Sequence, residues 1–320
     1  MHKRFVNQCT IDLTLVPCGP ILIKSGKEGA DPTKPDMEFV ETYHAGGRSI
    51  YLPGSSLKGA IRAHAERIVR TVGRDKRPTN GNALWASNPL NLDELKYLDT
   101  LSDSKDIYRL SSFTDQMFGN TSIASRVRIE DAYPLDSKQL KIEERNGVAI
   151  DRVFGSVAVG PFNYQVCTSG QFHTKIHLKN FSLAQLGLIG LVLRDLDEGW
   201  FGLGFAKSRG LGMVEVKLNS AVVQYPGCIL ENQYICSLGR QQQWSDNQLL
   251  GAGVFLDDEE RQNYGFTADD VQETDSIVAE SMALGFGVQL QWHGKEQVQD
   301  LFARAVRAWS ELLRKPGAAA

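Results

Sequence analysis

The spacing of apolar residues predicts a chain that mixes strands with helices. Apolar residues recur every three or four positions in residues 55–72, 182–194 and 297–314, which predicts three helices, each with one buried face. Residues 3–23 read as a strand, a turn from Pro17 to Pro20 and a short apolar strand, and residues 171–178 alternate as a strand does. The order strand, helix, strands, helix, Gly-rich turn, strand favours an α+β fold with an antiparallel sheet over a doubly wound parallel sheet.

The segments between these elements differ in character. "MEFVETYHAGGRSIYL" (37–52) predicts a hairpin that turns at Ala45-Gly46-Gly47. Residues 73–112 are polar and broken by prolines, so they are interpreted as an insertion with a short helix near 92–99. "RNGVAIDRVFGSVAVGPFNYQV" (145–166) is compatible with a long hairpin or with a flexible loop.

The stretch "IYLPGSSLKGAIR" joins a strand to the first helix. Pro53-Gly54 ends the strand, so Ser55 or Ser56 is expected to be the N-cap of the helix. Free amides at a helix start favour an anion, and Lys58 and Arg62 add positive charge on one face, so this end suits a phosphate. An ordinary capped helix with a solvated charged face is the alternative.

Charge narrows the possible partners. The chain has 320 residues and a formal net charge of -3, so a nucleic-acid site must be a local patch. Residues 54–77 contain seven Lys or Arg against two acids, whereas residues 255–276 contain eight acids and one Arg. The acidic segment is interpreted as a solvated loop or a protein-facing surface.

Other residue types point to a reducing compartment and to no resident zinc. The five cysteines include no Cys-x-x-Cys pair, which favours a reducing environment. His173 and His177 are four residues apart and could form a metal pair, but two histidines of a strand are the favoured interpretation. The absence of a signal peptide and of a long apolar run predicts a cytoplasmic protein with no membrane contact.

A second glycine-bearing motif, "GLGFAKSRGLG", surrounds three polar residues with glycines. Glycine lets a backbone approach a bulky anion closely, and the cations add charge, so the motif could bind a phosphate. A P-loop or a dinucleotide-binding loop would have to open a helix, whereas a strand follows here. A purely structural Gly-rich turn remains the alternative.

Four motifs in this order resemble the RAMP superfamily of CRISPR-associated proteins. They are "LPGSSLKGAIR", "MFGN", "NGVAIDR" and "GLGFAKSRGLGMVEV", and the resemblance spans about residues 5–220. The likeness is strongest to the backbone subunits of type III effector complexes, which implies guide RNA, target RNA and other subunits of such a complex as partners.

The resemblance implies a modified RNA-recognition (ferredoxin-like) fold with an antiparallel sheet, a thumb hairpin, a Gly-rich loop and insertions. Residues 1–220 would form the core, with the thumb at about 145–165 and the insertion at about 73–112, and residues 221–320 would be an extension ending in a helix. The residues it implies as RNA contacts are Ser55, Ser56, Lys58, Arg62, Arg152, Gly202, Gly204, Lys207, Ser208 and Arg209.

The resemblance to the backbone subunits of type III complexes, which cut target RNA with an aspartate upstream of the Pro-Gly-Ser-Ser motif, implies such a residue here. Asp36 is expected to take that role and to bind Mg²⁺, with Asp31 as the second candidate. Two alternatives stay open. The protein could be an inactive guide-binding scaffold, or it could process guide precursors with His44 and Tyr43 as an acid–base pair.

Overall fold

The computed structural model describes residues 4–26, 35–44, 46–78, 84–88 and 90–314. Its largest sheet has the strand order β15-β16-β9-β1-β8-β4, and β5 also pairs with β8. Every pairing in this sheet is antiparallel. The strands are β1 (Gln8–Pro17), β4 (Val127–Ile129), β5 (Tyr133–Pro134), β8 (Phe172–Lys179), β9 (Val214–Tyr225), β15 (Glu280–Ser281) and β16 (Val288–His293).

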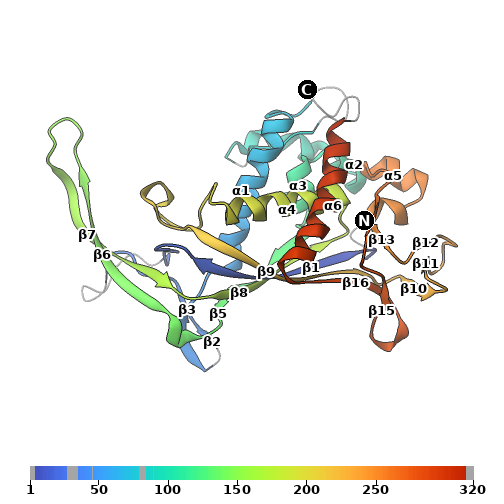
Figure 1. Cartoon of the computed structure of the whole chain (residues 1–320). Coiled ribbons are helices and arrows are strands. Elements are labelled where there is room, and N and C mark those ends of the chain that lie inside the picture. The colour runs from blue at the N-terminus through green and yellow to red at the C-terminus, as the bar shows by residue number, and fades with distance from the viewer. Residues whose placement is uncertain (1–3, 27–34, 45, 79–83, 89, 315–320) are drawn as a thin grey trace.

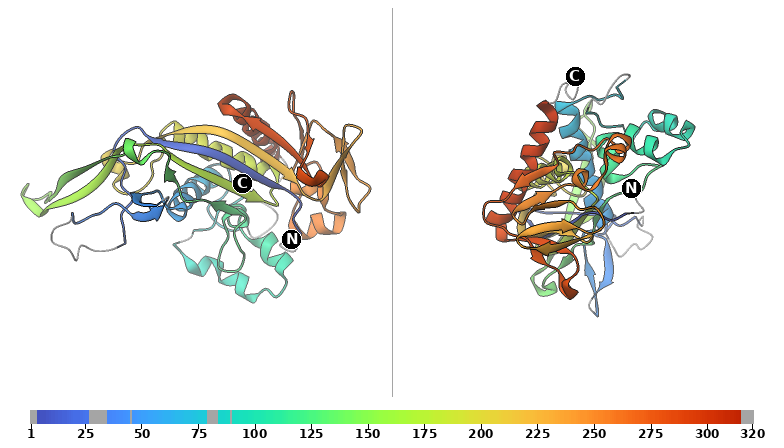
Figure 2. Two further views of the ribbon diagram at one scale, coloured as in Figure 1. Left: turned by 90° about the horizontal axis from the view of Figure 1, so that it is seen from below. Right: turned by 90° about the vertical axis from the view of Figure 1, so that its right-hand side faces the viewer.

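Three long helices lie on one face of this sheet and leave the other face open (Figures 1 and 2). They are α1 (Gly54–Val72), α4 (Leu183–Asp197) and α6 (Gly294–Arg314). Within the sheet, β1 alternates as expected, and Cys9, Ile11, Leu13 and Leu15 are buried. Burial of this apolar face under the helices forms the core.

The central part of the sheet has the ferredoxin-like topology. The chain runs β1–α1–β4–β8–α4–β9, and these four strands lie side by side in the order β9-β1-β8-β4. This is a split βαβ unit repeated twice, and it confirms the α+β fold with an antiparallel sheet.

The described part of the segment between α1 and β4 contains three short helices. They are η1 (Leu92–Thr100), α2 (Ser104–Leu110) and α3 (Phe113–Phe118), and one of them, α3, packs against α1. The short helix predicted near 92–99 is confirmed as η1.

Residues beyond β9 build further sheets and then return to the main one. They form β10 (Cys228–Glu231), β11 (Tyr234–Ser237), β12 (Gln243–Ser245), β13 (Gln248–Leu250), η4 (Ala252–Phe255), α5 (Asp258–Tyr264), β14 (Val271–Glu273) and η5 (Ala283–Gly285). β16 then pairs with the edge of β9, and α6 packs against α4. The packing is close, because a Cβ at Gly187 of α4 would meet Ala305 O of α6 at 2.5 Å.

Two hairpins extend from the sheet. The short one joins β2 (Glu41–His44) to β3 (Gly47–Ile50). The long one follows η2 (Ser137–Gln139) and pairs β6 (Lys141–Ile150) with β7 (Val157–Ser169), projecting far from the body (Figure 1). Residues 145–166 are therefore part of a hairpin rather than an irregular loop. Among the described residues, no helix combines the length and apolar character needed to span a bilayer.

Candidate nucleic-acid interface

The start of α1 is held by a residue far away in the sequence. The N-cap is Pro53, which makes no side-chain capping bond, and the amide of Gly54 donates to Asp131 Oδ1 at 2.7 Å. The expectation that Ser55 or Ser56 is the N-cap is therefore wrong. Because Asp131 takes over this part of the cap, both serines stay exposed at the helix start.

Gly54 is required here by space rather than by conformation. A Cβ at this position would lie 2.3 Å from Ile129 O, so the helix start is pressed against the end of β4. The Pro-Gly pair thus ends the preceding strand and also lets α1 begin directly on the sheet.

Lys58 lies one turn into α1 and keeps a partly exposed ammonium group. Its Nζ donates to Ser125 Oγ at 2.7 Å. Partial burial lowers the pKa of Lys58, and the nearby Arg62 guanidinium lowers that pKa further. Both effects disfavour the charged form, so an added phosphate would restore favourable charge at this position.

Arg62, in contrast, is committed to contacts within the chain. Its Nε donates to Glu66 at 2.8 Å, its Nη2 donates to Asp115 at 2.8 Å, and its Nη1 donates to the carbonyl of Gly119 at 2.8 Å. Asp115 is fully buried and also accepts from the hydroxyls of Ser87 and Ser112. The structure therefore places Arg62 in the support that orders the "MFGN" segment beside α1.

The Gly-rich loop packs against the segment that follows β1. Phe205 N donates to Leu22 O at 2.7 Å, and Gly212 N donates to Pro20 O at 2.8 Å. A Cβ at Gly204, which has φ +79°, would lie 2.2 Å from Leu22 O. Gly204 is thus needed for close approach to the chain's own backbone.

The polar residues of this loop face solvent. Lys207, Ser208 and Arg209 form the short helix η3 (Lys207–Arg209) and are exposed. In the described part of the chain, neither cation has a hydrogen-bonding or ion-pair partner. Gly202 is buried inside the turn, close to the backbone of Gly212. The loop can therefore offer Lys207 and Arg209, with their intervening hydroxyl, to an external anion.

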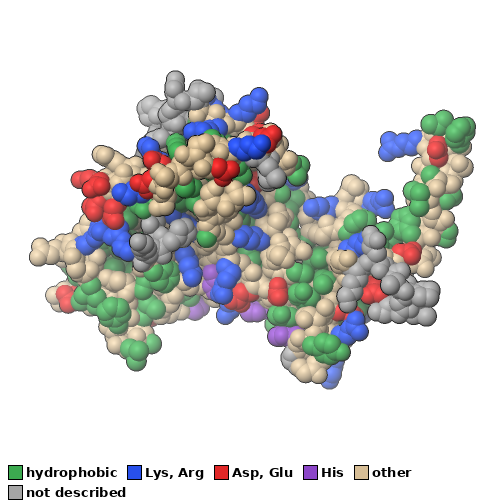
Figure 3. All heavy atoms as spheres, turned by 180° about the vertical axis from the view of Figure 1, so that it is seen from behind, with side chains coloured by type: hydrophobic (Ala, Val, Ile, Leu, Met, Phe, Trp, Pro, Cys, Tyr) green, Lys and Arg blue, Asp and Glu red, His purple; other side chains and the backbone are tan. Residues whose placement is uncertain are grey.

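The tip of the β6–β7 hairpin is apolar. Val153 and Phe154 are 84% and 83% exposed, and Ile150, Val157 and Val159 add further exposed apolar surface. Hydrophobic side chains gather at this end of the hairpin in Figure 3. Exposed apolar groups held away from the body mark a contact surface rather than a core.

The turn at this tip is fixed by its aspartate. Asp151 Oδ1 accepts from the amides of Val153 at 2.7 Å and Phe154 at 2.9 Å. These two amides lower the pKa of Asp151 below its ordinary value. Arg152, the cation of the predicted "NGVAIDR" motif, lies in this turn and is exposed.

Asp36 lies beside the middle of β7 in the same hairpin. Its Oδ2 accepts from Asn163 N of β7 at 2.9 Å, and the side chain is exposed. The neighbouring backbone runs alongside β7, since Met37 N donates to Asn163 O and Gln165 N donates to Met37 O. The carboxylate is therefore anchored to the hairpin by one oxygen. Asp31 lies outside the described residues.

Aromatic rings stack beside the short hairpin. The His44 ring lies flat on Tyr133 with 3.7 Å between ring centroids, and Tyr51 stacks on Tyr133 at 5.8 Å. Tyr43 is 81% exposed. Adjacent residues of a strand point to opposite sides, so Tyr43 and His44 do not face a common atom.

The open face of the sheet carries paired histidines. His173 Nε2 lies 2.9 Å from Asp12 Oδ1, and His177 Nε2 lies 2.8 Å from Glu130 Oε1. Both histidines belong to β8, as the strand interpretation predicted. Over the described ranges, no group of three or more His, Cys, Asp or Glu side chains is arranged to hold a metal ion.

Sequence reasoning missed Asp131 and the His44–Tyr133 stack. Nothing local to Asp131 signals a cap for a helix that begins 77 residues earlier. The cluster of Tyr51, Tyr133 and His44 likewise joins residues that are distant along the chain.

Comparison with models of known protein families matches residues 14–215 to the RAMP superfamily. The match begins in the last part of β1 and ends two residues into β9, and between them it includes β4, β8, α1, α4, the long hairpin and the Gly-rich loop. Comparison with curated proteins finds no match.

Proposed function

Because the chain belongs to the RAMP superfamily of CRISPR-associated RNA-binding proteins, we propose that it is a guide-RNA-binding backbone subunit of a type III CRISPR effector complex. In this proposal the complex cleaves RNA complementary to the guide. The single observation that supports a cleaving role is the exposed carboxylate of Asp36, held by Asn163 N midway along β7 of the projecting hairpin.

Guide RNA would lie across the start of α1 and the Gly-rich loop. Lys58, Lys207 and Arg209 would contact phosphates, while the hydroxyls of Ser55, Ser56 and Ser208 would donate hydrogen bonds to phosphate oxygens. Such contacts do not read the sequence, which suits a subunit that must accept any guide. Arg62 would act indirectly by ordering the segment that Lys58 contacts.

The β6–β7 hairpin would interrupt the duplex between guide and target. Its tip presents Val153 and Phe154, apolar side chains that can pack against a nucleobase face. Asp36 is bonded to Asn163, nine residues along the chain from Phe154. A target strand displaced at the tip would therefore run along the hairpin to bring one of its phosphates to this carboxylate.

The proposed reaction is attack of a target 2′-hydroxyl on the adjacent phosphorus. The 2′-hydroxyl gives its proton to water as its oxygen forms a new bond to phosphorus. The bond to the 5′-oxygen breaks, that oxygen takes a proton from water, and the products are a 2′,3′-cyclic phosphate and a 5′-hydroxyl. Asp36, with one oxygen fixed by Asn163, would orient the attacking hydroxyl. Bound Mg²⁺ would neutralise charge on the phosphate oxygens.

Asp36 fits a loosely held Mg²⁺ rather than a caged one. Mg²⁺ is commonly bound through one or two carboxylates, with water and substrate phosphates completing its shell. One exposed carboxylate meets that need when RNA is present. Asp31 could provide the second.

The test is cleavage of guide-paired target RNA by the assembled complex with and without Mg²⁺. Asp36→Ala should abolish cleavage and leave guide and target binding nearly unchanged, and chelation of the metal should have the same effect. Glu215→Ala, which removes another exposed carboxylate, is the matched control and should cleave normally.

Three other results would change the proposal. Full cleavage by Asp36→Ala together with loss in Asp31→Ala would transfer the role to Asp31. If the unmodified complex binds target without cutting it, the protein is an inactive scaffold. Cleavage of precursor guide RNA by the protein alone would favour the processing alternative.

A further inference from the structure

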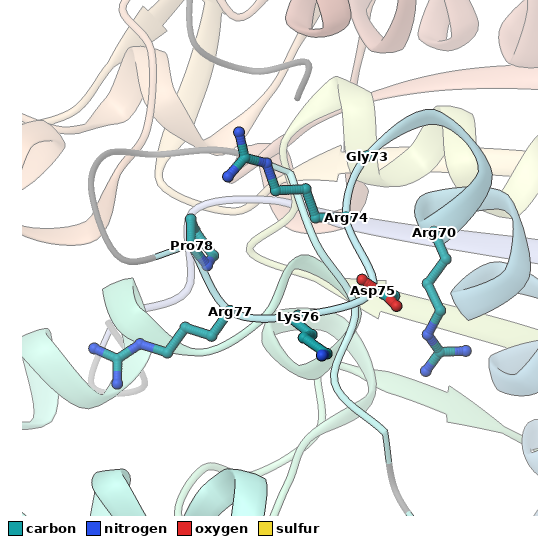
Figure 4. Close-up of a pocket in the computed structure, with 7 residues that line it drawn as sticks. All are labelled: Arg70, Gly73, Arg74, Asp75, Lys76, Arg77 and Pro78. Atoms are coloured by element: carbon teal, nitrogen blue, oxygen red, sulfur yellow. The ribbon is translucent and has the colours of Figure 1, made fainter.

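The C-terminal end of α1 carries a second concentration of positive charge. Residues 67–78 contain five cations and one acid, although the chain as a whole is slightly acidic. A pocket lined by Arg70 and residues 73–78 opens where the helix ends, and Figure 4 shows its side chains. The cations are Arg67, Arg70, Arg74, Lys76 and Arg77, and the acid is Asp75.

Two of these cations already have partners. Arg70 donates to Glu66 at 3.4 Å and to the carbonyl of Ser87. The guanidinium of Arg77 stacks over the ring of Tyr97, 3.6 Å from its centroid. The ion pair with Glu66 offsets part of the charge of Arg70, whereas stacking on Tyr97 holds Arg77 in place and leaves its charge uncompensated.

The other three cations are available to a ligand. Arg67, Arg74 and Lys76 are exposed, and none of them forms an ion pair within the residues described. A helix C-terminus favours cations, but this effect falls off within the last turn, so it does not account for Arg74 and Lys76 beyond the helix end. Like charges on one short loop repel one another, and a bound polyanion would relieve that repulsion.

The arrangement favours an extended anion over a small one. In Figure 4, Arg74 and Arg77 point to different sides of the loop, while Lys76 extends in a third direction. A single phosphate would require donors that converge on one point. Cations that radiate over an area instead match a row of charges, as in a nucleic-acid backbone.

The exposed face of α1 runs from this pocket to the N-terminal end of the helix. Ser56, Gly59, Ala63 and Arg67 lie along one exposed stripe, and three of these four side chains are small. The sole acid of α1 is Glu66, which is buried at 3% exposure. No α1 carboxylate would therefore repel a phosphate chain along this stripe.

We propose that single-stranded RNA continues from the start of α1 along this stripe and is held at the basic pocket by Arg74 and Lys76. This inference rests on the proposed RNA-binding function and adds a second contact point to it. α1 has 19 residues, so it is about 28 Å long, or about eight nucleotides at ~3.4 Å each.

The test compares the binding of RNAs that can and cannot span both ends of α1. The double variant R74A/K76A is titrated with single-stranded RNAs of about 5 and about 20 nucleotides over a range of salt concentrations. The expected result is about tenfold weaker binding of the long RNA, a salt dependence shallower by about 1.4 units of slope, and unchanged binding of the short RNA.

Controls separate this inference from the proposed function. Lys179→Ala combined with Lys217→Ala removes the same charge from exposed positions of β8 and β9 and should not alter the salt slope. A melting temperature equal to that of the unmodified protein should show that R74A/K76A is folded, and the charge-conserving R74K/K76R should retain binding.

If R74A/K76A binds the long RNA with unchanged affinity while Lys58→Ala still weakens binding, the proposed RNA contact at the pocket is wrong. The RNA-binding function would then still stand. If R74A/K76A binds both RNAs normally but fails to join its complex, the pocket contacts protein instead. If the unmodified protein, alone and within its complex, binds neither RNA, the proposed function and this inference both fail.

Discussion

At the scale of single residues, α1 separates cations that can meet RNA from cations that support the fold. Lys58 and Arg62 are one turn apart and have the same charge. Lys58 keeps a partly exposed ammonium group, whereas three nitrogens of Arg62 donate to acceptors within the chain. Similar positions in the sequence pattern thus have different physical roles.

Arg62→Ala should therefore lower stability rather than weaken RNA contact directly. The change leaves the buried carboxylates of Asp115 and Glu66 without this cation, and breaking a buried pair costs roughly 3 kcal/mol of unfolding free energy. Urea unfolding measures the loss. Arg67→Ala is the matched control, because Arg67 is exposed and its removal should change stability by no more than about 0.5 kcal/mol.

An Arg62→Ala protein of normal stability would show that the ion pairs with Asp115 and Glu66 contribute little to stability.

Lys58→Ala should weaken RNA binding without lowering stability. Urea unfolding should be unchanged, and the salt dependence of RNA binding should be shallower by about 0.7 unit of slope for one lost contact with single-stranded RNA.

At the scale of elements, the β6–β7 hairpin keeps its order through its own hydrogen bonds. Its two strands pair over most of their length, and the tip turn is closed by Asp151. The apolar tip side chains contribute little to folding because they are exposed. They are therefore free to serve a partner.

Replacing Val153 and Phe154 with Ser should leave the melting temperature unchanged and slow target cleavage at least about tenfold, while guide binding persists. Cleavage of guide-paired RNA measures activity, and thermal unfolding measures stability. Leu284→Ser with Phe286→Ser is the matched control, since these side chains are 103% and 59% exposed away from the hairpin. Normal cleavage by the tip variant would argue against a role in displacing nucleotides.

At the scale of the whole molecule, the C-terminal segment completes the core. β16 pairs with β9 through six residue pairs, and Trp292 of β16 is fully buried. Leu301 and Ala305 of α6 are also fully buried, and Gly187 and Gly190 allow α4 to lie close to α6. The main sheet and its helical layer are thus shared between the family-matched region and the residues after it.

A chain that ends at residue 226 should consequently fail to form a soluble monomer. Its truncation uncovers the edge of β9 and the apolar side of α4, and exposed strand edges promote association. Size-exclusion chromatography and circular dichroism test this. A folded, monomeric fragment would show that residues 227–320 are dispensable to the core.

The sequence by itself determined the local elements, their order and the family. Apolar spacing predicted the helices of α1 and α4, and the motif order pointed to the ferredoxin-like core that the structure shows. These features depend on residues close together along the chain, where periodicity and turn chemistry act.

Only the tertiary structure decided which groups meet. Asp131 caps α1 across 77 residues, and Asn163 anchors Asp36 across 127. Arg62 likewise bonds to Asp115, 53 residues further along the chain. β16 joins the main sheet although the strands of the small sheets precede it in the sequence. Such contacts depend on how distant segments pack, and the spacing of residues along the chain does not record that packing.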